Sequence, residues 1–129
     1  MRFTMGFLLI ILIAVIEVSC GGQPQIENIC VPPVPRLDVV EPQSAKTHSP
    51  SLLLTVRGSN FVPASVIFFD GRATPTTYIS PQQLRSVVPF DLLLKVGPIS
   101  VDVFNPQDTF TCQYGRSQSS NAMTFTLTP

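Results

Sequence analysis

The residues of this 129-residue chain best suited to chemistry are its three cysteines, Cys20, Cys30 and Cys112. A thiol can be acylated, paired in a disulfide or bound to a metal, and its sequence context indicates which. The cysteines form no C-x-x-C pair, and the only histidine is His48. The common thiolate and imidazole metal motifs are therefore missing from the sequence, and we expect no metal site and no cofactor.

Cys20 follows a segment with the pattern of an export signal. Arg2 precedes an apolar run from Met5 to Ile16, and small residues follow up to Gly22. A basic start, a short apolar stretch and small residues are typical of a secretory signal. The run is shorter than the roughly 20 residues that a membrane-spanning helix needs. We therefore predict that residues 1–19 are a signal peptide.

The residues before Cys20 resemble the lipobox of bacterial lipoproteins. Val18-Ser19-Cys20 fill its last three positions, and Glu17 stands where an aliphatic residue is usual. The resemblance implies that the Cys20 sulfur receives a diacylglyceryl group and that Cys20 becomes the acylated N-terminus, a stable membrane anchor. The next residue is Gly21, and an aspartate at this position would resemble an inner-membrane retention signal. In a Gram-negative host the resemblance therefore implies that the lipoprotein is anchored in the outer membrane. The alternative is a conventional signal peptide, which would leave a soluble secreted protein.

The segment after the signal is rich in Gly and Pro and shows no alternation of apolar residues. We predict that residues 20–35 form a tether between membrane and domain, and that residues 36–129 form one domain. An exported chain meets an oxidising compartment, in which an even pair of cysteines tends to form a disulfide. We therefore expect Cys30 to pair with Cys112.

No group of residues has the pattern of a catalytic site, and we expect no enzymatic activity. His48 lies in a Ser/Thr/Pro-rich loop without a nucleophile at a defined spacing, so we interpret it as a solvated loop residue. The acidic residues Asp70, Asp91, Asp102 and Asp108 do not form the closely spaced loop of a calcium site.

The charge of the chain argues against nucleic-acid partners. The formal net charge is +0, and the basic residues are scattered. No row of Lys and Arg is available to neutralise a phosphate backbone, so we expect no nucleic-acid binding.

The elements that carry these residues are short strands. The pattern predicts seven, bounded by Gly, Pro or polar residues: 36–40, 52–57, 64–69, 73–79, 83–88, 98–105 and 122–127. Between the first two we expect a polar loop over 43–50, and before the last a polar insertion over 106–119. This spacing predicts an all-β, immunoglobulin-like Greek-key β-sandwich of about seven strands.

The most specific stretch is Leu52 to Gly71, LLLTVRGSNFVPASVIFFDG. Gly58 stands where a chain leaving a strand often needs a positive φ angle. Phe61 has the size to fill the end of the core. Asp70-Gly71 is a type I′ hairpin signal. Phe68 and Phe69 should lie on opposite faces of their strand, so one of them could contribute to a binding surface.

These residues resemble the IPT/TIG family, an immunoglobulin-like domain shared by plexins, Met-type receptors and Rel-type transcription factors. The resemblance runs from about Pro35 to Leu127 and is strongest at Gly58-Ser59-Asn60-Phe61 followed by Asp70-Gly71. It implies a non-enzymatic module for binding, adhesion or scaffolding, with an unknown protein or glycan partner. The alternative is an accessory carbohydrate-binding module, which the presence of only 2 Tyr and no Trp disfavours.

Overall fold

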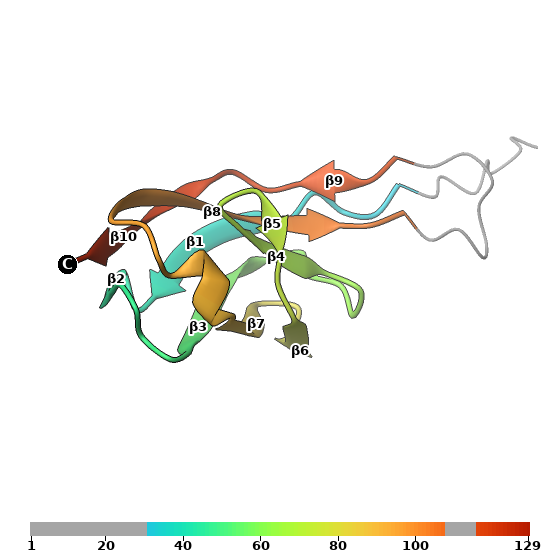
Figure 1. Ribbon diagram of the computed structural model, residues 1–129. Coiled ribbons are helices and arrows are strands. Elements are labelled where there is room, and N and C mark those ends of the chain that lie inside the picture. The colour runs from blue at the N-terminus through green and yellow to red at the C-terminus, as the bar shows by residue number, and fades with distance from the viewer. Residues whose placement is uncertain (1–30, 108–115) are drawn as a thin grey trace, which may run out of the picture.

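A computed structural model describes residues 31–107 and 116–129 of the chain (Figure 1). These residues form ten strands and one short 3-10 helix. In order along the chain they are β1 (Arg36–Glu41), β2 (Ser44–Lys46), β3 (Leu52–Ser59), β4 (Val66–Phe69), β5 (Arg72–Ala73), β6 (Thr76–Ser80), β7 (Gln83–Val88), η1 (Phe90–Leu92), β8 (Gly97–Asn105), β9 (Gln118–Ser119) and β10 (Met123–Thr128).

The strands form two sheets that pack face to face as a sandwich. The first sheet has the order β1-β3-β7-β6, and the second has the order β2-β10-β8-β4-β5, with β9 also paired to β8. The chain passes from one sheet to the other after β1, β2, β3, β5 and β7, so most strands pair with strands distant in sequence. The predicted all-β, immunoglobulin-like sandwich is therefore confirmed.

Alternation along the strands produces the core between the sheets. On β8, Ile99, Val101 and Val103 are buried, as their spacing predicts. The rings of Phe69 and Phe125, one from β4 and one from β10, meet edge to face with centroids 5.4 Å apart. Side chains from both sheets thus share one apolar core.

The structure corrects three of the predicted boundaries. The predicted loop over 43–50 contains β2, which pairs in parallel with β10 and packs Ala45 against the core. The predicted strand over 73–79 is divided into β5 and β6, which belong to different sheets. The predicted insertion over 106–119 contains β9, which pairs Ser119 with Phe104.

The division of the predicted strand 73–79 has a local cause. Pro75 has no N–H to donate to a ladder, so a continuous strand is disfavoured at that position. Thr74 is buried, and its hydroxyl donates a hydrogen bond of 2.8 Å to the carbonyl of Ile67. The chain therefore changes sheet at Thr74–Pro75.

Across residues 31–107 and 116–129, no helix is long and apolar enough to cross a membrane.

Candidate functional site

The motif residue Gly58 lies within β3 and allows two strands to approach closely. A Cβ atom at Gly58 would overlap the backbone carbonyl of Arg36 on β1 and would lie 3.1 Å from the ring of Phe61. Gly58 does not have the positive φ angle that its position predicts; Asn60, two residues later, has it, with a φ of 62°. The glycine is therefore required by close packing rather than by backbone conformation.

Phe61, Asp70 and Gly71 have the structural roles that the sequence predicts. Phe61 is 3% exposed and lies in the core. Asp70 and Gly71 have φ angles of 53° and 72°, the pair of left-handed residues that a type I′ turn needs. They join β4 to β5 through the pairing of Phe69 with Arg72.

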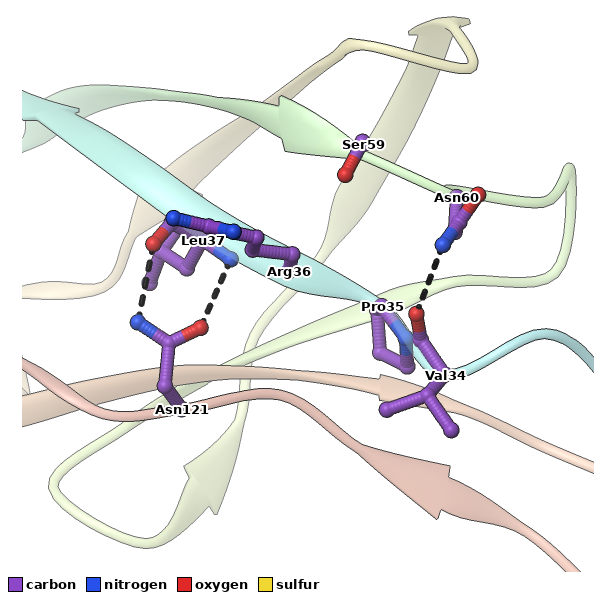
Figure 2. Close-up of a pocket in the computed structure, with 7 residues that line it drawn as sticks. All are labelled: Val34, Pro35, Arg36, Leu37, Ser59, Asn60 and Asn121. Atoms are coloured by element: carbon purple, nitrogen blue, oxygen red, sulfur yellow. Dashed lines mark hydrogen bonds between the residues drawn. The ribbon is translucent and has the colours of Figure 1, made fainter.

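A surface pocket lies where the chain enters the sandwich (Figure 2). Figure 2 shows the Asn121 side chain facing Leu37 and the Asn60 side chain facing Val34. Asn121 accepts a hydrogen bond of 2.9 Å from the Leu37 N–H and donates one of 2.8 Å to the Leu37 carbonyl. Asn60 donates one of 3.0 Å to the Val34 carbonyl. The amides thus bind the backbone of the leading segment, residues 31–37.

A third asparagine completes this arrangement from inside the sandwich. Asn105, at the end of β8, is fully buried, and its amide nitrogen donates hydrogen bonds of 2.8 Å to the carbonyls of Pro33 and Asn60. Its oxygen accepts a hydrogen bond of 2.5 Å from the Ser65 hydroxyl. We refer to Asn60, Asn105 and Asn121 together as the asparagine clamp.

The clamp is suited to holding the chain rather than to catalysis. Every buried side-chain nitrogen and oxygen of the described residues has a hydrogen-bond partner. The one charged side chain that lines the pocket, Arg36, forms an exposed ion pair with Asp38 at 3.0 Å. The sequence patterns predict no role for Asn105 or Asn121. An asparagine in register with inward-facing Ile99, Val101 and Val103 is the signal that could have revealed Asn105.

A second feature lies on the outer surface of the second sheet, on β4 and β8. Phe68 on β4 is opposite Asp102 on β8, and Val66 is opposite Phe104. The rings of Phe68 and Phe104 meet edge to face with centroids 5.7 Å apart. We call Val66, Phe68, Asp102 and Phe104 the outer patch. All four are partly buried, whereas Phe69 is fully buried, so the predicted opposite orientation of Phe68 and Phe69 is confirmed.

The carboxyl group of Asp102, in the outer patch, is partly desolvated. Burial raises the pKa of Asp102 above its ordinary value, because removal of water disfavours the charged form. No ion pair or hydrogen bond of its side chain offsets this effect among the described residues.

The other sequence candidates do not assemble into a site. His48 is exposed. Its backbone N–H donates a hydrogen bond of 2.8 Å to the Leu93 carbonyl, and the centroid of its ring lies 6.4 Å from that of Phe90. Within residues 31–107 and 116–129, no three His, Cys, Asp or Glu side chains are grouped as metal ligands would be. Cys20, Cys30 and Cys112 lie outside the described residues, as do Asp108 and the signal segment.

The fold and the clamp define an immunoglobulin-like β-sandwich domain. The solution structure of the TIG domain from human nuclear factor of activated T-cells, cytoplasmic 4, is similar to this chain, with a TM-score of 0.50 and 19% identity over 74% of this chain and 89% of that one. At this identity the similarity shows the fold alone. None of the curated proteins compared with this chain matches it significantly.

The IPT/TIG domain family model matches residues 35–127, and the chain belongs to this family. Domains of this family are typically non-catalytic, and membership indicates an immunoglobulin-like module for binding or scaffolding.

Proposed function

We propose that this chain is an exported binding module, anchored by a lipid on Cys20 and acting at the cell envelope without enzymatic activity. The observation that carries the proposal is the order of its parts. A domain of the IPT/TIG family occupies residues 35–127, and it follows a sequence segment with the pattern of an export signal, which ends in the lipobox-like Val18-Ser19-Cys20. The lipid would supply the membrane contact, and the sandwich would bind a protein partner.

The asparagine clamp supports the anchoring role. Hydrogen bonds from Asn105 and Asn60 hold the carbonyls of Pro33 and Val34, so the chain is fixed to the sandwich before β1 begins. A pull on the lipid would therefore be transmitted to the folded domain at Pro33. The part of the predicted tether that acts as a spacer would then be residues 20–32.

The disulfide between Cys30 and Cys112 is a further part of the proposal. Asn105 contacts Pro33, which is three residues after Cys30, and so holds Pro33 beside the end of β8. The segment that contains Cys112 follows β8 in the sequence. Figure 1 shows the leading segment beside this end of β8 and β9. Because an extended chain spans about 3.3–3.6 Å per residue, the segments from Pro33 back to Cys30 and from Asn105 on to Cys112 are long enough for the two thiols to meet.

Fatty-acid labelling tests the anchoring. We expect bacteria that process lipoproteins and are fed an alkyne-tagged palmitate to label the wild-type chain and the Cys30→Ser control. The Cys20→Ser variant should remain unlabelled, because it lacks the acceptor sulfur. A wild-type chain without label, or equal labelling of Cys20→Ser, would overturn the lipid anchor.

A further inference from the structure

The outer patch combines two features that attract the same kind of ligand. Asp102 is a carboxylate on the middle of β8, directly opposite Phe68 and two residues from Phe104, so all three side chains project from one face. Aromatic faces carry partial negative charge and attract cations within about 6 Å of the ring centroid. A carboxylate attracts cations through charge-assisted hydrogen bonds.

Within residues 31–107 and 116–129, no basic side chain pairs with Asp102. The ion pairs of the described residues join Arg36 to Asp38, Arg57 to Glu41 and Arg72 to Asp91, and none involves Asp102. The side chains that flank Asp102 on its face, Ser100, Phe104 and Phe68, are uncharged. Residues 1–30 and 108–115 contain a single basic residue, Arg2, which belongs to the predicted signal peptide.

We propose that the outer patch is a docking site for a basic side chain of a protein partner, with Asp102 receiving the ammonium or guanidinium group and Phe68 and Phe104 contacting its alkyl stem and charge. This inference rests on the proposed role as a binding module and names the chemistry of its partner. The patch leaves Asp102 partly buried without a counter-ion, and a partner's arginine would supply both the missing charge and hydrogen-bond donors.

The geometry favours a basic peptide over a sugar. Carbohydrate recognition by stacking needs an exposed aromatic face, whereas Phe68 and Phe104 are partly buried and inclined at 67° to each other. The two rings meet edge to face, and Asp102 lies directly opposite Phe68 on the same face of the sheet. A long side chain with a cationic end fits this surface better than a flat pyranose ring.

Binding of two matched peptides to the full-length purified chain tests the inference. The probes are acetyl-Leu-Arg-Leu-amide and the same peptide with citrulline, which keeps the shape of arginine but lacks its charge. We expect the arginine peptide to shift the NMR signals of Phe68, Asp102 and Phe104, with at least fivefold weaker binding of the citrulline peptide. Asp102→Asn should reduce the affinity for the arginine peptide to that level, while Asp38→Asn, an exposed carboxylate on β1, should leave it unchanged.

The inference would be overturned if the two peptides bound equally, or if Asp102→Asn bound the arginine peptide as tightly as the wild type. It would also be overturned if the sugar maltohexaose shifted these NMR signals and the peptides did not. Photo-crosslinking in the cell envelope separates failure of the outer patch from failure of the proposed function. A photo-crosslinking residue is introduced either at Ser100, beside Asp102, or at Leu53, on the first sheet. Crosslinks to a protein from Leu53 alone would contradict the outer patch and retain the binding module. An absence of crosslinks from both positions would contradict the binding module as well.

Discussion

The asparagine clamp and the outer patch are both polar, but they differ in how their polar groups are satisfied. The amide of Asn105 is fully buried and has a partner for its oxygen and for both of its N–H groups. The carboxylate of Asp102 is partly buried and has neither an ion-pair nor a hydrogen-bond partner among the described residues. A fully buried amide with hydrogen-bond partners stabilises the fold, whereas a partly buried carboxylate without a protein partner can gain one on binding.

The comparison predicts that substitutions in the clamp lower stability and that substitutions in the outer patch change binding. The largest effect is expected for Asn105→Ala. The change leaves the Pro33 and Asn60 carbonyls and the Ser65 hydroxyl without their partner, so we expect the free energy of unfolding to fall by about 3 kcal/mol. Urea denaturation measures it, with exposed Thr124→Ala as the control. A loss below about 1 kcal/mol would contradict a stabilising role for the asparagine clamp.

Gly58→Ala should follow in magnitude. The added methyl group overlaps the Arg36 carbonyl, so β1 must move away from β3, and we expect a loss of about 2 kcal/mol. Gly71→Asn is the matched control, because Gly71 has a φ of 72° and open space, and asparagine tolerates that conformation. Equal losses from both variants in thermal and urea denaturation would show that close approach is not the reason for Gly58.

Asn121→Ala sharpens the same comparison at the surface. Asn121 is exposed, so water can replace its two hydrogen bonds to Leu37, and we expect a loss of only about 1 kcal/mol. Asn121→Asp keeps the acceptor for the Leu37 N–H but places a carboxylate against the Leu37 carbonyl. We therefore expect it to be no more stable than Asn121→Ala in the same denaturation experiment; stability equal to the wild type would contradict the paired contact.

The smallest effect on stability is expected for Asp102→Asn, and its sign depends on pH. The folded-state pKa of Asp102 is raised, so its contribution to stability is fully present below the unfolded-state carboxyl pKa of about 3.9 and is lost as the pH rises through the folded-state pKa. Relative to the wild type, Asp102→Asn should be more stable at neutral pH and lose this advantage in acid. Because solvent screens the partly exposed carboxylate, we expect a gain of no more than about 0.5 kcal/mol. A variant less stable than the wild type at pH 7 would indicate a structural role for Asp102.

Much of the sandwich could be predicted from local patterns. Alternation on β8 identified its inward side, and Asp70-Gly71 identified the hairpin, because both depend on neighbouring residues. The sheet change at Thr74–Pro75 and the strand β2 could not be predicted in this way. Both depend on partners distant in sequence, the Ile67 carbonyl and β10.

The two polar regions show the same limit. Gly58 was identified as a motif residue, but its reason, the carbonyl of Arg36, lies on another strand. Asn121 acts through Leu37, which is 84 positions away in sequence. The desolvation of Asp102 follows from its placement between Phe68 and Phe104, and only the register of β4 against β8 establishes this placement.

The central claim, a sandwich anchored through Cys20 and closed by a disulfide, is tested most directly by the intact mass of the chain isolated from bacterial membranes. We expect a chain that begins at Cys20 and carries the diacylglyceryl and N-acyl groups. Because of the disulfide, its mass should be lower than that of its reduced form by the mass of two hydrogens. An unmodified chain that begins after Cys20 would contradict the anchor, and a mass unchanged by reduction would contradict the disulfide.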